Sequence, residues 1–153
     1  MEDDVDQHPH DLIVVGVDGS DASKDALRWA ARQAKVTGAS LRAVMTWQVP
    51  VGTYAAPMAL PGGYDFGPEA ERTLDESIRE VLGEHPGVEV SAVVIEGHPA
   101  PKLLEAAADA TLLVVGSRGH GAFTGMLLGS VSEHCVAHAP CPVVVVRHSP
   151  DPA

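Results

Sequence analysis

The stretch TLLVVGSRG (residues 111–119), followed after nine residues by Gly129-Ser130, decides the fold of this chain. Residues 111–115 form a short apolar run of the kind found in buried parallel strands. A glycine loop follows, and residues 131–138 are predicted to be a helix with Ser130 at its N-cap. This order predicts an anion site, because the first N–H groups of a helix lack intrahelical partners and the helix dipole favours negative charge there. Glycine allows the backbone to take positive φ and to approach an anion closely.

Outward from this stretch, apolar runs alternate with amphipathic segments. The expected strands are residues 12–17, 41–47, 88–95, 111–115 and 143–147. The expected helices are a first one capped by Asp21 or Ser23 and stopped by Gly38, then residues 68–82, 100–108 and 131–138. This βαβαβαβαβ order predicts a doubly wound α/β fold, with a five-stranded parallel sheet, right-handed crossovers and helices on both faces.

The chain of 153 residues has a common single-domain size. Residues 11–148 are expected to form one domain, between disordered tails at residues 1–10 and 149–153. Residues 49–67 are rich in proline and glycine and show no apolar period, which predicts a long functional or mobile loop.

Composition excludes some classes of function. The net charge of −11 argues against non-specific binding to nucleic acid or to an anionic membrane, since both need a basic surface. No segment reaches the length of a transmembrane helix, and the N-terminus MEDDVDQHPH is the reverse of a secretory signal, so a cytoplasmic protein is predicted. Cys135 and Cys141 are expected to be ordinary thiols, with a disulfide as the alternative.

The Gly-x2-Gly-x9-Gly-Ser spacing resembles the nucleotide-binding signature of the universal stress protein family, in the branch that binds ATP. The likeness includes LIVVGVDGS (12–20), VIEGHPAPKLLEAA (94–107) and CPVVVVR (141–147), and it spans nearly the whole chain. It implies the sheet order 3-2-1-4-5, with a ligand crevice between the carboxyl ends of strands one and four. It also implies a homodimer in which the last strands, residues 143–147, pair with each other and so cover an apolar edge.

The resemblance further implies which residues bind the nucleotide. The first strand and the turn after it would line adenine and ribose, the second strand would contact adenine through its backbone, and the glycine loop and following helix start would hold ribose and phosphates. These residues are Gly16, Val17, Asp18, Thr46, Gly116, Ser117, Arg118, Gly119, Gly129, Ser130, Val131 and Ser132. Asp18 is also a weak candidate ligand for Mg²⁺.

Purely structural interpretations stand beside these roles. Gly116 and Gly119 can be turn glycines, Asp18 can stabilise the start of the first helix, and Arg118 can be merely solvated. His120 is interpreted as a bystander. Cys135, together with His134 and His138, is interpreted as structural rather than nucleophilic, and the histidines show no metal-site spacing such as HExxH.

Two familiar nucleotide motifs are absent from the sequence. There is no P-loop Gly-x4-Gly-Lys-Ser/Thr, and no GxGxxG follows the first strand. A set of base, metal and charge clamps for fast phosphoryl transfer cannot be assembled either. The predicted function is therefore ATP binding with a regulatory or stress-response role, and at most slow hydrolysis. The alternatives are a slow Mg²⁺-dependent ATPase, a protein that binds AMP or a cyclic nucleotide, and an interaction module that needs no nucleotide.

Overall fold

The computed structural model describes residues 11–49, 65–118 and 128–148. The predicted tails, residues 50–64 of the predicted loop, Gly119 and His120 lie outside the described residues. The elements in chain order are β1 (Leu12–Gly16), α1 (Asp21–Thr37), β2 (Ser40–Trp47), α2 (Gly67–Leu82), β3 (Val90–Glu96), α3 (Pro99–Ala106), β4 (Leu112–Gly116), α4 (Ser130–His138) and β5 (Val143–Val146).

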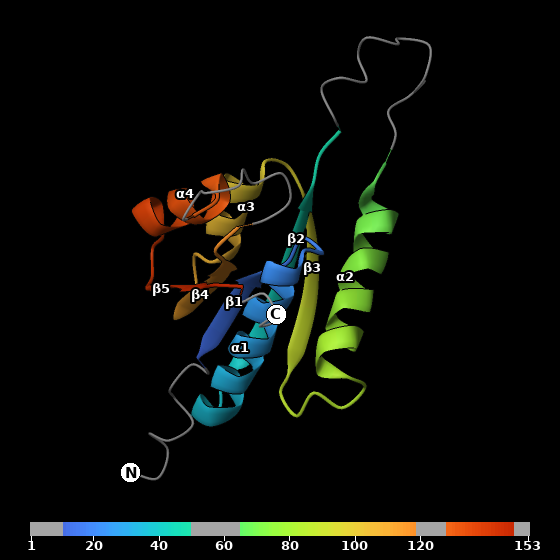
Figure 1. Cartoon of the computed structure of the whole chain (residues 1–153), viewed down its shortest axis with the longest axis vertical. Helices are drawn as coiled ribbons and strands as arrows, with labels where there is room; N and C mark the ends of the chain where they lie inside the picture. Colours follow the sequence, from blue (N-terminus) through green and yellow to red (C-terminus); the bar gives the residue numbers. More distant parts are fainter. Residues whose placement is uncertain (1–10, 50–64, 119–127, 149–153) are drawn as a thin grey trace, which may run out of the picture.

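The five strands form one parallel sheet in the order β3-β2-β1-β4-β5 (Figure 1). Helices α1 and α2 contact each other on one face of the sheet, and α3 and α4 contact each other on the other face. The predicted doubly wound fold and its sheet order are therefore confirmed. β1 lies at the centre, and its middle residues are fully buried because helices cover both faces.

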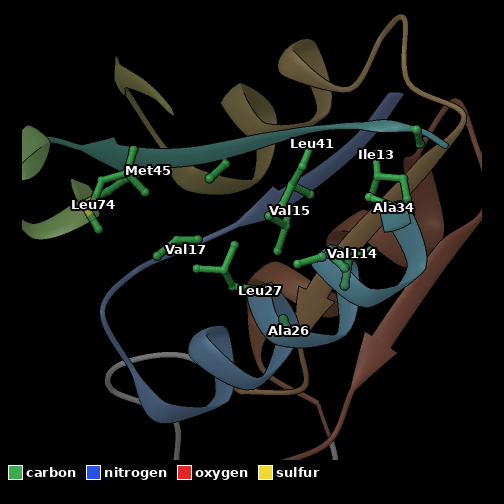
Figure 2. Packing of buried hydrophobic residues seen from close by; sticks show 14 of the residues in the cluster. Ile13, Val15, Val17, Ala26, Leu27, Ala34, Leu41, Met45, Leu74 and Val114 are labelled. Atoms are coloured by element: carbon green, nitrogen blue, oxygen red, sulfur yellow. The ribbon is translucent and has the colours of Figure 1, made fainter. Parts of the chain in front are cut away.

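The core is aliphatic, as the scarcity of aromatic residues predicts. Successive residues of β1 point to opposite faces: Val15 packs toward α1, whereas Val14 belongs to the cluster on the side of α3. Figure 2 shows Val15, Val114 and Leu27 of α1 among the side chains of the first of these clusters. An alanine stripe along α1, which includes Ala26 at 0% exposure, allows this helix to lie close to the sheet.

Most element boundaries fall within two residues of those predicted, and the helix stop at Gly38 is confirmed. Gly38 adopts the left-handed conformation at φ 77° and its N–H donates to Ala34 O. The predicted N-cap of α1, Asp21 or Ser23, is wrong. Ser20 is the N-cap, because it is extended and its hydroxyl accepts a hydrogen bond from the N–H of Ser23.

Candidate functional site

The carboxyl ends of β1 and β4 lie side by side at one edge of the sheet. The two strands pair directly, with Ile13 opposite Leu112 and Val15 opposite Val114. The chain leaves β1 toward α1 on one face and leaves β4 toward α4 on the other face. A switch point of this kind is where open α/β sheets bind ligands.

Both strands end in a glycine that makes room for a helix. A Cβ on Gly116 would lie 2.9 Å from the backbone carbon and oxygen of Ala22 at the start of α1, and one on Gly16 would lie 2.9 Å from a Cδ of Leu103 in α3. Gly116 belongs to β4 and is not among the described glycines with positive φ, so it does not use the backbone freedom that glycine allows. Close helix packing explains this glycine instead.

The turn after β1 is held by its own side chains. An Asp18 carboxylate oxygen accepts hydrogen bonds from the N–H of Ser20, at 2.9 Å, and from the Ser20 hydroxyl. The Ser23 hydroxyl donates to Ser20 O at 2.9 Å and accepts from the N–H of Asp18 at 3.2 Å. Asp18 therefore stabilises the start of α1, which agrees with the purely structural interpretation of this residue.

The ends of the loop after β4 are joined to each other. The N–H of Ser117 donates to Val146 O of β5 at 2.8 Å, and the N–H of Gly129 donates to Ser117 O at 2.6 Å. The Ser132 hydroxyl lies 3.0 Å from Ser117 O and 3.0 Å from Gly129 O, and this side chain is 2% exposed. We call these contacts among Ser117, Gly129 and Ser132 the loop clasp. The two halves of the predicted signature therefore meet in space.

The start of α4 differs from the prediction. Gly129 is the N-cap, with φ −77° and ψ 168°, and its carbonyl accepts the first helical hydrogen bond from the N–H of Glu133 at 3.0 Å. Ser130 is the first helical residue and is exposed, and among the described residues no side chain caps the helix. The prediction of Ser130 as N-cap is therefore wrong. The N–H groups of residues 130–132 lie in the first turn, where a helix offers them no backbone acceptor.

The remaining predicted residues lie at the same edge of the sheet. The N–H of Val17 donates to Val44 O at 2.8 Å, which extends the pairing of β1 with β2 beyond the end of β1. Val17 is buried, and Thr46, near the end of β2, is half-buried. Arg118 is exposed directly after the buried Ser117.

The sequence interpretation missed the roles of Ser20, Ser23 and Val146 at this edge, although it considered Ser23 as an N-cap. The local signal for the first two is the spacing Ser20-x-x-Ser23, in which a hydroxyl reaches the N–H three residues on. No local signal points to Val146, because its carbonyl joins the site only through the pairing of β5 with β4.

The two cysteines do not form a reactive centre in the described part of the chain. Cys135 is 0% exposed, and burial raises the pKa of its thiol to about 11. Cys135 and Cys141 are both free thiols, so no disulfide joins them. Within the described ranges, no group of three or more potential metal ligands occurs, and no helix is long and apolar enough to cross a membrane.

Known proteins share this fold and much of this sequence. The model of the universal stress protein family matches residues 10–147. A universal stress protein of Mycobacterium tuberculosis is 41% identical over 143 residues, which cover 92% of this chain and 46% of that protein. The chain thus spans about half the length of the curated relatives that it matches.

Solved structures agree with this match. A universal stress protein in complex with cAMP is 27% identical with a TM-score of 0.63, over 91% of this chain and 98% of that one. The universal stress protein from Archaeoglobus fulgidus in complex with dAMP shares the fold at a TM-score of 0.64 and 22% identity, over 90% of this chain and 98% of that one. The chain belongs to the universal stress protein family.

Proposed function

We propose that this chain binds ATP at the carboxyl edge between β1 and β4 and acts as a nucleotide-dependent regulator in a stress response. The observation that carries the proposal is the start of α4. It has a glycine N-cap, no side-chain cap, and a position set by the loop clasp. A helix start of this kind presents N–H donors and a favourable dipole to phosphate oxygens.

The phosphate groups would be held by the backbone of α4. The N–H groups of Ser130, Val131 and Ser132 would donate to phosphate oxygens, and the exposed Ser130 hydroxyl would add a further donor. Gly129 would give the phosphates room to approach rather than a hydrogen bond, because its N–H already bonds to Ser117 O. Arg118 and Gly119 complete the proposed phosphate side, with Gly116 and Ser117 positioning the loop.

The adenosine part would lie against the ends of β1 and β2. Gly16, Val17 and Thr46 would form the wall beside the base, and Asp18 would face the ribose. The Asp18 carboxylate is exposed, although one oxygen accepts bonds from Ser20. A role of Asp18 in holding Mg²⁺ stays a prediction.

Binding of an adenine mononucleotide is the second candidate function. Two solved relatives carry cAMP or dAMP, as reported above. The uncapped first turn of α4 favours the longer phosphate chain of ATP, because it offers several N–H donors in sequence.

A homodimer formed through residues 143–147 also belongs to the proposal. In the described part of the chain, β5 pairs with β4 on one side and with no strand on the other. Its four valines are only half-buried, and an apolar strand edge of this kind invites pairing with a second copy. We further propose a cytoplasmic location and, at most, slow hydrolysis of ATP.

The test combines identification of the co-purifying nucleotide with calorimetric titration of ATP, AMP and cAMP. We expect ATP to bind most tightly, and Ser130→Ala to weaken ATP binding about tenfold, since one charge-assisted hydrogen bond contributes roughly 1.5 kcal/mol. Ser91→Ala, at an exposed serine of the edge strand β3, is the matched control and should bind ATP as the wild type does. Absence of binding of all three nucleotides would refute the proposal, and tighter binding of cAMP or AMP would select the second candidate.

A further inference from the structure

Two histidine rings lie together on the outer side of α4. His134 and His138 are one helical turn apart, and both are exposed. Their ring centroids are 4.5 Å apart and the ring planes are inclined by 46°. Cys135, by contrast, points into the core at 0% exposure. We propose that His134 and His138 chelate a divalent transition-metal ion such as Zn²⁺, at the opposite end of α4 from the proposed phosphate site.

The spacing of the rings suits a shared ion. A zinc–nitrogen bond of about 2.0–2.1 Å, with the ring centre roughly 1.1 Å beyond the nitrogen, places two imidazoles of one tetrahedral ion with centroids roughly 5 Å apart. The observed 4.5 Å is about half an ångström shorter than that separation. A small rotation of the two exposed side chains would therefore be enough to aim a nitrogen of each ring at one ion.

The electrostatic surroundings favour a cation here. His138 is the last residue of α4, and the C-terminal end of a helix carries partial negative charge. The chain as a whole carries a net charge of −11, and the exposed Glu133 precedes His134. Neutral imidazole is also the commonest protein ligand for such ions.

The protein supplies two ligands to this site. The described part of the chain contains no group of three potential metal ligands, so water would occupy the remaining coordination positions. Binding is therefore expected to be weaker than at a structural zinc site, where four protein ligands close the coordination shell.

The experiment is a titration of the full chain with Zn²⁺, followed by calorimetry and by NMR of the histidine ring protons. His8 and His10 are separated by one residue and offer a competing site, so the titration uses a His8→Ala/His10→Ala background. We expect the rings of His134 and His138 to shift together, and His134→Ala to weaken zinc binding at least tenfold. His85→Ala, at an exposed histidine before β3, should leave zinc affinity unchanged.

A second variant separates chelation from the mere number of histidines. V136H/H138A keeps two histidines on α4 but places them two residues apart, where helix positions do not face each other. Val136 is 53% exposed, so the new ring fits at the surface. This variant should lose affinity as His134→Ala does, with an unchanged circular dichroism spectrum. The proposal would be overturned if V136H/H138A bound zinc as tightly as the background protein does. It would also be overturned if zinc caused no shifts of the His134 and His138 ring signals in the background protein.

Discussion

The starts of α1 and α4 follow nearly identical strands, LIVVG in β1 and LLVVG in β4, yet they are built differently. The start of α1 is closed by side chains, because Ser20 caps the helix and Asp18 in turn binds Ser20. The start of α4 has a glycine N-cap and no side-chain cap. The first turn of α1 therefore has a side-chain acceptor for the N–H of Ser23, whereas among the described residues no side chain caps the first turn of α4.

The connecting segments explain how this difference arises. Residues 17–20 link β1 to α1 directly, so local hydroxyl and carboxylate groups reach the first turn. The chain between β4 and α4 runs from residue 117 to residue 129, and the loop clasp draws its two ends together. The position of the second start thus depends on contacts between residues distant in sequence rather than on a local side-chain cap.

The largest expected loss of stability is at Gly116, where β4 and the start of α1 approach each other closely. Gly116→Ala would place its Cβ 2.9 Å from the Ala22 backbone, which cannot move without shifting α1. We expect a loss of about 2–3 kcal/mol of unfolding free energy, as for overpacked cores. Urea denaturation measures this loss.

Gly16→Ala is the matched control, because the atom that it meets is the end of the flexible Leu103 side chain. Its loss should be about 1 kcal/mol or less, since Leu103 can change rotamer. Equal losses for the two variants would contradict the assignment of Gly116 to backbone packing.

The loop clasp should give the next largest effect. Ser132→Ala removes a buried hydroxyl that bonds to Ser117 O and Gly129 O, so about 1–2 kcal/mol of stability should be lost. ATP affinity should fall as well, because the ends of the loop would then be joined only by the backbone bond between Gly129 and Ser117. Denaturation and ATP titration of the same variant test both points. A variant as stable as the wild type would show that the hydroxyl does not hold the loop.

The two helix starts can be compared directly by removing one serine from each. Ser20→Ala should cost about 1 kcal/mol, the usual effect of losing an N-cap. Ser130→Ala should change stability by less than about 0.5 kcal/mol, because Ser130 makes no cap bond. Thermal unfolding without nucleotide measures both. The comparison fails if Ser130→Ala destabilises the chain as much as Ser20→Ala does.

The smallest expected effect concerns the pH dependence of α1. The His148 ring, 2.6 Å from the Asp25 carboxylate, and then Arg28 lower the pKa of Asp25 below its ordinary value of 3.8. Because the pKa of Asp25 is lower in the folded chain than in the unfolded chain, its ionised carboxylate stabilises the fold fully at pH values above about 3.8. This stabilisation is lost as the pH falls from about 3.8 through the folded-state pKa. Asp25→Asn should therefore be less stable than the wild type at pH 6 and should approach it at acid pH. A stability difference that does not change with pH would contradict this ion pair.

The sequence was sufficient for much of the fold but for less of the site. Apolar runs and glycine stops locate the strands and helices, since periodicity and backbone preference are local properties. The N-caps Ser20 and Gly129 were missed, because neighbouring polar residues offer several capping positions and only the backbone conformation selects one. The expectation that the histidines show no metal-site spacing was wrong for His134 and His138, which are four residues apart as the two histidines of HExxH are. Only the structure shows that both rings are exposed and adjacent.

The sequence by itself determined the alternation of strands and helices, the aliphatic core and the glycine signature that indicates an anion site. The sheet order followed from the family resemblance, and the structure confirmed it. Only the tertiary structure decided that Gly116 accommodates α1, that Ser132 closes the loop and that Ser117 bonds to β5. The physical reason is that these contacts join residues far apart in the chain, whose approach depends on how helices pack against the sheet rather than on local preference.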